Sequence, residues 1–129
     1  MAFILIPKTG EDIVINAWNW RPTLRLLLDA KLIDEDLYES MAIHGKRGSV
    51  GADTACRIAD FLDLRLARMK EGERIRADLT TTSEPKKQVI FRSGMLADEV
   101  DAVDLHSATY EWLAQFCEFC RRSGGFTVS

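Results

Sequence analysis

The sequence has little that would anchor, export or cross-link a protein. It contains only three cysteines and three prolines, and no apolar run approaches the roughly 20 residues that a membrane-spanning helix needs. The apolar run at residues 3–6 stops at Pro7 and has no basic residue before it, unlike a signal peptide. The cysteines Cys56, Cys117 and Cys120 are odd in number and lack the spacing of a disulfide framework, which indicates reduced thiols. We therefore expect a soluble, cytoplasmic protein.

A strong charge of either sign is also missing. The 17 basic and 20 acidic residues leave a net charge of −3, which is too small and of the wrong sign for a general nucleic-acid-binding protein. Hydrophobic residues make up 47% and charged residues 29%, a balance that is typical of a folded domain and argues against disorder. The 129 residues fit one globular domain, with an exposed linker at about residues 80–87. We expect neither nucleic acid nor a membrane as partner.

Strand-forming segments near both ends of the chain and helix-forming segments between them predict an α+β fold. Residues 3–6 and 13–16 are rich in β-branched and aromatic side chains and flank a turn in which Gly10 supplies a positive φ, which predicts an N-terminal hairpin. A lone hairpin is marginally stable in water, and the strand-like tail at residues 126–128 is predicted to add a third strand. The predicted fold is a mostly helical single α+β domain with this small antiparallel sheet.

Helical spacing is visible in the first half of the chain after the hairpin. The first predicted helix has Pro22 in its first turn and Asn19 or Trp20 at its cap. Leucines at helical spacing form its apolar stripe, with Lys31 at the edge of the stripe. A second, short helix is predicted to begin at Asp34, where a run of acidic residues favours the positive end of a helix dipole.

The second half of the chain has two clear helices and one ambiguous segment. Apolar residues at helical spacing predict a helix over residues 52–71. Residues 88–103 fit either a strand or one side of a helix, and we favour the helix. The last helix is predicted to have its cap at Asp104 or Ser107 and to end at Gly124.

The ending Phe-Cys-Arg-Arg-Ser-Gly-Gly-Phe, at residues 119–126, resembles the C-terminus of a family of small bacterial proteins of uncharacterised function. That family also has a tryptophan soon after an N-terminal hairpin, matched by Trp18 or Trp20. A glycine-containing loop then leads into an alanine-rich helix, matched by residues 51–55 and 58–60. The resemblance implies a bacterial or phage origin, and it brings no activity with it.

The spacing Cys117-x-x-Cys120 suggests metal or redox chemistry. A zinc site needs about four ligands, usually from two short-spaced pairs, and only Cys56, His44 and His106 are available to complete this one. Redox pairs lie at a helix N-terminus, whereas this pair is near the C-terminal end of its predicted helix. Both thiols also share the apolar stripe of that helix, so we favour core packing and expect no metal or cofactor.

Residues 42–51 lose the helical pattern and are predicted to form a glycine-rich loop. Backbone amides near glycines, two cations and a following helix N-terminus are the features that bind anions. The candidate anion-binding residues are Lys46, Arg47, Gly48, Ser49 and Gly51. The spacing departs from a P-loop, since Lys46 precedes the second glycine, and Asp53 would repel a phosphate. A solvated loop whose glycines serve backbone geometry is therefore favoured.

Residues 18–21, Trp-Asn-Trp-Arg, concentrate the side chains that dominate binding hot spots. On a turn between strand and helix alternate residues point to different sides, so the two indoles need not be buried together. The alternative is that both pack beneath the helices with Trp112. The candidate partner-binding residues are Trp18, Trp20 and Arg21 as anchors, with Asp34, Asp36 and Glu39 as a charged rim.

Motifs for catalysis are lacking. The chain has two histidines and neither a Gly-x-Ser-x-Gly, a His-Glu-x-x-His nor a strand-linked dinucleotide loop. We therefore predict a non-catalytic protein that binds another protein. Small acidic binders of this size include the immunity proteins that cap toxins, so an immunity-type or regulatory role is the preferred form. The alternatives are a small-anion or nucleotide-responsive module built on the 44–51 loop, and a structural protein that self-associates into a homo-oligomer.

Overall fold

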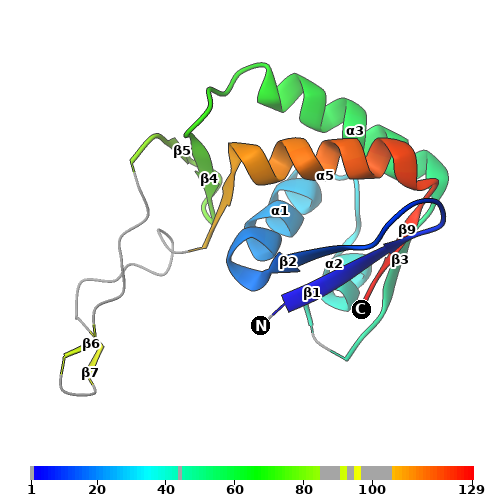
Figure 1. Ribbon diagram of the computed structural model, residues 1–129, viewed down its shortest axis with the longest axis horizontal. Helices are drawn as coiled ribbons and strands as arrows, with labels where there is room; N and C mark the ends of the chain where they lie inside the picture. The colour runs from blue at the N-terminus through cyan, green and yellow to red at the C-terminus, as the bar shows by residue number, and fades with distance from the viewer. Residues whose placement is uncertain (1, 44, 85–90, 93–94, 97–105) are drawn as a thin grey trace.

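The computed structural model describes residues 2–43, 45–84, 91–92, 95–96 and 106–129, and the fold is given for these residues (Figure 1). The elements in chain order are β1 (Ala2–Pro7), β2 (Ile13–Asn16), α1 (Ala17–Asp29), α2 (Glu35–Ala42), β3 (Gly48–Val50), α3 (Ala52–Leu66), β4 (Arg74–Arg76), β5 (Thr81–Thr82), β6 (Phe91–Arg92), β7 (Met95–Leu96), β8 (Ser107–Thr109), α5 (Tyr110–Ser123) and β9 (Phe126–Val128). Helices packed on small antiparallel sheets make this an α+β fold, as predicted. No helix in the described residues is long and apolar enough to cross a membrane.

The main sheet has four antiparallel strands in the order β2-β1-β9-β3. β9 lies between the N-terminal hairpin and β3, with Val128 opposite both Leu5 and Gly48. The two ends of the chain therefore meet in one sheet (Figure 1), and the third strand predicted for the hairpin is confirmed. The loop predicted over residues 42–51 is wrong at Gly48–Val50, because the free edge of β9 pairs with this segment.

The alternation of side chains along β1 decides which face of the sheet is covered. Phe3 and Leu5 are buried, whereas Ile4 and Ile6 point outward. On the covered face the ring of Phe126, in β9, lies 5.9 Å from Phe116 and 5.3 Å from Phe119 of α5 between centroids. Helices α3 and α5 lie side by side above this face (Figure 1), so the core lies between the helices and the sheet.

Two buried indoles join the helices. The ring of Trp20, in α1, packs edge-on against Trp112 and Phe116 of α5, at 6.3 and 5.4 Å between centroids. The Trp20 indole donates its N–H to the carbonyl of Met41 in α2 at 2.9 Å, and Trp112 donates to the Thr23 hydroxyl at 2.8 Å. Because both indole N–H groups have acceptors, the hydrogen bonds compensate for the loss of water when these large side chains are buried.

Helix α1 begins earlier than the sequence suggested. Its first residue is Ala17 and its cap is Asn16, whose side chain accepts a backbone N–H of the first turn. Pro22 therefore lies inside the helix and not in its first turn, where its ring nitrogen has no N–H to donate to the helix. Trp18 and Trp20 consequently lie on a helix and not on a turn.

Two predicted helices end sooner than expected. Helix α1 stops at Asp29, and Lys31 adopts a φ of 60° beyond it, so the prediction that Lys31 continues the apolar stripe is wrong. Helix α3 stops at Leu66 and not at residue 71. Met69 still reaches the core from the turn that follows, which explains why its spacing suggested a continuous helix.

Helix α5 begins at Tyr110, with Thr109 as its cap. The predicted cap at Ser107 is wrong, because Ser107 is buried in β8 and this strand pairs with β4 as far as Thr109. The other predicted cap, Asp104, lies outside the described residues. The helix ends at Gly124, whose φ of 68° confirms the predicted glycine stop.

Short strands occupy some described residues of the segments that were predicted to be a linker and a helix. Thr81–Thr82 pair with β4, so the linker predicted over residues 80–87 is wrong at these two residues, while 85–87 lie outside the described residues. Within 88–103, Phe91–Arg92 and Met95–Leu96 form paired antiparallel strands, so the helix prediction is wrong there. The remaining residues of 88–103 lie outside the description. Strands of two or three residues carry almost no periodic signal.

The variant Gly48→Ala tests the packing of β3 against α2. A Cβ at this buried glycine would lie 2.5 Å from Cγ of Met41 and 3.3 Å from its backbone nitrogen. We expect a destabilisation of about 1–3 kcal/mol, measured by urea unfolding with tryptophan fluorescence. The matched control is Gly51→Ala, whose Cβ meets nothing within 4 Å and which should cost about 0.5 kcal/mol. Equal losses in the two variants would contradict the described packing.

Candidate functional site

Helix α1 has two faces of opposite character. The inward face buries Trp20, Leu24 and Leu27, whereas Trp18 is 45% exposed and Arg21 is also exposed. Two residues along a helix turn the side chain by about 200°, so the adjacent indoles point in opposite directions. Trp20 has 0% exposure, and the prediction that it is a surface anchor is therefore wrong.

The outward face of α1 continues across neighbouring elements. The indole ring of Trp18 lies 4.5 Å from the ring of His106, just before β8, in a tilted contact. The guanidinium of Arg25 lies 5.7 Å from the ring centroid of Tyr38 in α2. We call Trp18, Arg21, Arg25, Tyr38 and His106 the α1 patch. Within it a surface depression of about 200 Å³ is lined by Arg21, Pro22, Arg25, Tyr38, Ala77 and His106.

Hydrogen bonds on the inward side of α1 hold the backbone that carries the α1 patch. On the inward side, the Thr23 hydroxyl donates to the carbonyl of Asn19 at 2.8 Å and accepts the indole N–H of Trp112. The side-chain oxygen of Asn19 accepts the backbone N–H of Thr109 at 3.0 Å. These bonds join α1 to β8 and α5, three residues from His106. The elements that carry the patch are thus held together by part-buried and buried hydrogen bonds.

Within the residues that the structure describes, the two arginines of the patch are not paired with acidic side chains. In the described part of the chain no ion pair joins Arg21 or Arg25 to a carboxylate. The only acidic residue of α1 is Asp29, at its C-terminal end. The i, i+4 spacing of the arginines was a signal in the sequence that could have revealed Arg25. Tyr38 and His106 lacked any such signal, because only the packing of α2 and β8 brings them to α1.

The predicted acidic rim divides into a structural and an exposed part. The carboxylate of Asp34 accepts the backbone N–H of Leu37 at 2.8 Å and so caps α2. Asp36 and Glu39 are exposed on the same helix. Their part in binding stays a prediction.

The predicted anion-binding residues are divided between different elements. Gly48 packs against Met41, and the Ser49 hydroxyl lies 3.2 Å from that of Thr127 in the sheet. Lys46 and Arg47 are exposed ahead of β3, and His44 lies outside the described residues. Ser49 and Gly51 help line a depression of about 270 Å³ at the end of the sheet, where the lining cation is Lys8.

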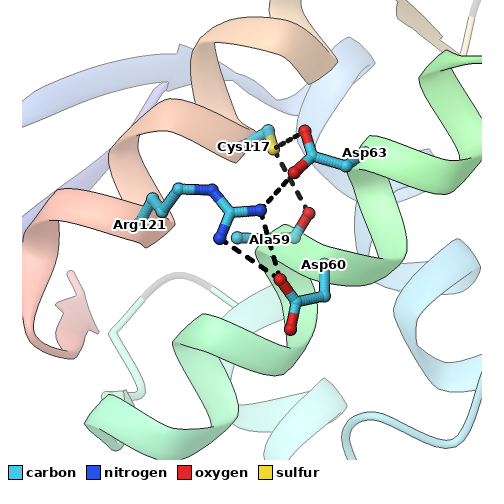
Figure 2. Close-up of polar contacts among 5 residues, drawn as sticks. All are labelled: Ala59, Asp60, Asp63, Cys117 and Arg121. Atoms are coloured by element: carbon cyan, nitrogen blue, oxygen red, sulfur yellow. Dashed lines mark hydrogen bonds and ion pairs between the residues drawn. The ribbon is translucent and has the colours of Figure 1, made fainter.

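A polar cluster joins α3 and α5 (Figure 2). The Cys117 thiol lies 3.3 Å from both the carbonyl of Ala59 and a carboxylate oxygen of Asp63. The Arg121 guanidinium reaches between Asp60 and Asp63 and pairs with both, at 3.2 Å from the Asp60 carboxylate. Figure 2 shows the thiol and the guanidinium meeting the same Asp63 carboxylate. These contacts join α3 to α5.

The cysteines in α5 are held in the protonated form. Burial, helped by the hydrogen bond to Asp63, raises the pKa of Cys117 to about 11. Burial also raises the pKa of Cys120 far above its usual range. The bonds from Cys117 and Arg121 in turn lower the pKa of Asp63. Because thiolates are the nucleophiles and metal ligands, the cluster is suited to helix packing and not to thiol chemistry.

Both thiols of the Cys117-x-x-Cys120 motif are buried, as their place on the apolar stripe predicted. The third, Cys56, is exposed on α3. Among the residues that the structure describes, no group of three or more histidine, cysteine or acidic side chains is arranged to hold a metal ion.

Comparison with protein-family models, with curated proteins and with solved structures finds no match for this chain. The resemblance of residues 119–126 to a bacterial family therefore stays a prediction. The segment has a clear structural role here, because it carries the end of α5 through Gly124 and Gly125 into β9. A Cβ at Gly125, whose φ is 105°, would lie 2.8 Å from the carbonyl of Val50. Only glycine fits this close approach between the helix end and β3.

The three cysteines should differ in reactivity. In the native protein a thiol-specific aromatic disulfide should modify Cys56 alone, because Cys117 and Cys120 are buried and protonated. All three should react after unfolding. The measurement is the absorbance of the released thiolate, with Cys56→Ser as control. Rapid modification of a second thiol in the native protein would contradict the packing of α5.

The same burial predicts a loss of stability at high pH. Folding raises the pKa of Cys117 from 9.0 to about 11, so the stabilisation is complete below pH 9.0 and is lost as the pH rises towards 11. The thermal midpoint of the native protein should fall across this window. In Cys117→Ala the fall should be smaller, because one of the two shifted thiols is gone. An equal fall in both proteins would show that Cys117 does not contribute.

Proposed function

We propose that this protein is a non-catalytic module that binds another protein through the α1 patch. The observation that carries the proposal is a half-exposed indole beside two arginines that lack ion pairs within the described residues, all on one hydrogen-bonded helix. Tryptophan and arginine are the residues that most often carry the free energy of protein association. A rigid helix presents them with little loss of conformational entropy on binding.

Further properties of the chain support a binding role over a catalytic one. The thiols of Cys117 and Cys120 have raised pKa values that disfavour a nucleophile. The net charge of −3 argues against a nucleic-acid partner. The free cysteines support a reducing, cytoplasmic location, and the ending at residues 119–126 supports a bacterial origin. A cap on a toxin, as in immunity proteins, is the specific form of this function that we propose.

Self-association is the second candidate function. Ile4, Ile6 and Val14 are exposed together on the outer face of the main sheet, where Ile4 lies opposite Val14. Light scattering of the purified protein distinguishes the candidates, because self-association gives an oligomer without any partner. The anion-responsive alternative has less support, since Gly48 serves the packing of Met41 and the predicted loop is partly a strand.

The variant Trp18→Ala tests the α1 patch. The ring contacts His106 at the surface, so its removal should leave the fold and the thermal midpoint nearly unchanged. Affinity capture from the native host, followed by titration of the purified partner, should show binding about 30-fold weaker than wild type, because truncating a hot-spot side chain costs about 2 kcal/mol or more.

The matched control is Leu64→Ala, which removes another exposed apolar side chain, on α3. It should retain the partner with unchanged affinity. If Trp18→Ala binds the partner as tightly as wild type does, the patch is not the interface. If Trp18→Ala unfolds, the indole belongs to the core and the proposal is wrong.

A further inference from the structure

The size of the depression in the α1 patch limits what it can hold. Its volume of about 200 Å³ corresponds to roughly six or seven water molecules, at about 30 Å³ each. Binding sites for cofactors and other small molecules commonly measure roughly 300–1,000 Å³. The depression therefore fits one side chain of a protein partner better than it fits a nucleotide.

The charge around the depression selects an anionic occupant. Arg21 and Arg25 are four residues apart on α1, a spacing that brings the Cβ atoms of a helix to about 5–6 Å. Two like charges in this position repel each other, and no described carboxylate forms an ion pair with either. A carboxylate between the two guanidinium groups would relieve the repulsion and accept hydrogen bonds from both.

The flanking aromatic rings add position and apolar contact. Tyr38 lies under the Arg25 guanidinium, and this cation–π contact holds the arginine beside the depression before any partner arrives. Trp18, on the same helix, has an exposed indole that contacts the ring of His106. An apolar side chain next to the bound carboxylate would cover that indole.

We infer that the α1 patch binds an acidic segment of a protein partner, in which a glutamate or aspartate carboxylate sits between Arg21 and Arg25 and an adjacent apolar residue packs on Trp18. This inference rests on the proposed function and names the chemistry of the partner. It assigns a role to Arg25, and to Tyr38 and His106, which no signal in the sequence pointed to.

The test uses the full chain and a synthetic peptide with three Glu-Leu-Gly repeats, blocked at both ends. Nuclear magnetic resonance of the three tryptophan indole N–H groups reports the site directly. Millimolar peptide should shift the Trp18 signal, while the signals of the buried Trp20 and Trp112 stay in place. Arg21→Gln should weaken binding at least about tenfold, since a hydrogen bond to a charged group contributes about 1.5–3 kcal/mol. Arg57→Gln, which removes the same charge from the exposed side of α3, should bind like wild type.

Other outcomes overturn the inference. They are the absence of a Trp18 shift, equal binding of a peptide with glutamine in place of glutamate, or equal shifts from inorganic phosphate at matched ionic strength. Tighter binding of a single-stranded oligonucleotide would assign the arginines to a different class of partner.

Capture of the native partner separates this inference from the proposed function. If Trp18→Ala loses the partner and Arg21→Gln keeps it, the protein-binding function stands and the acidic segment is wrong. If the peptide binds as expected but Trp18→Ala keeps the native partner, the patch recognises carboxylates and the proposed interface is wrong.

Discussion

The burial of Trp20 is the constraint on which the rest of the structure depends. Its ring contacts Trp112 and Phe116 of α5, and its N–H bonds to the carbonyl of Met41 in α2, so one side chain joins three helices. Removal of a buried indole typically costs about 3–5 kcal/mol, a large part of the 5–15 kcal/mol that stabilises a domain. The orientation of α1 is fixed by this contact. Since the α1 patch lies on the outward face of α1, the burial of Trp20 also determines which side chains of α1 are exposed.

The cluster between α3 and α5 and the α1 patch differ in their chemical character. Between α3 and α5, the arginine and the thiol both have partners, and Arg121 is matched by Asp60 and Asp63. On α1, the arginines contact an aromatic ring or solvent but no described carboxylate. A cluster whose charges are satisfied internally stabilises the fold. A cluster whose charges have no ion-pair partner among the described residues is available to another protein. This contrast is the reason for proposing the interface on α1.

Predictions from sequence succeeded where the signal is local. The N-terminal hairpin, the start of α2 next to Asp34 and the stop of α5 at Gly124 each follow from a few adjacent residues. They failed for β3, β4, β5 and β8, which have two or three residues each. In the pairing of β4 with β8, Arg74 lies opposite Thr109, which is far along the chain. Neither segment alone therefore carries a signal for the pairing that makes it a strand. The cap positions at Asn16 and Thr109 were missed because each cap is also the last residue of a strand, β2 or β8.

The sequence by itself determined the α+β class, the buried stripe of α5 with both its cysteines, and the concentration of tryptophan and arginine at residues 18–21. These depend on composition and spacing, which act over a few turns of chain. Only the tertiary structure decided that Trp20 points inward and Trp18 outward, since that depends on where α1 begins and on what packs against it. It also decided that Tyr38 and His106 join Arg21 and Arg25, because side chains so distant in sequence meet only when the helices and the small sheet pack together.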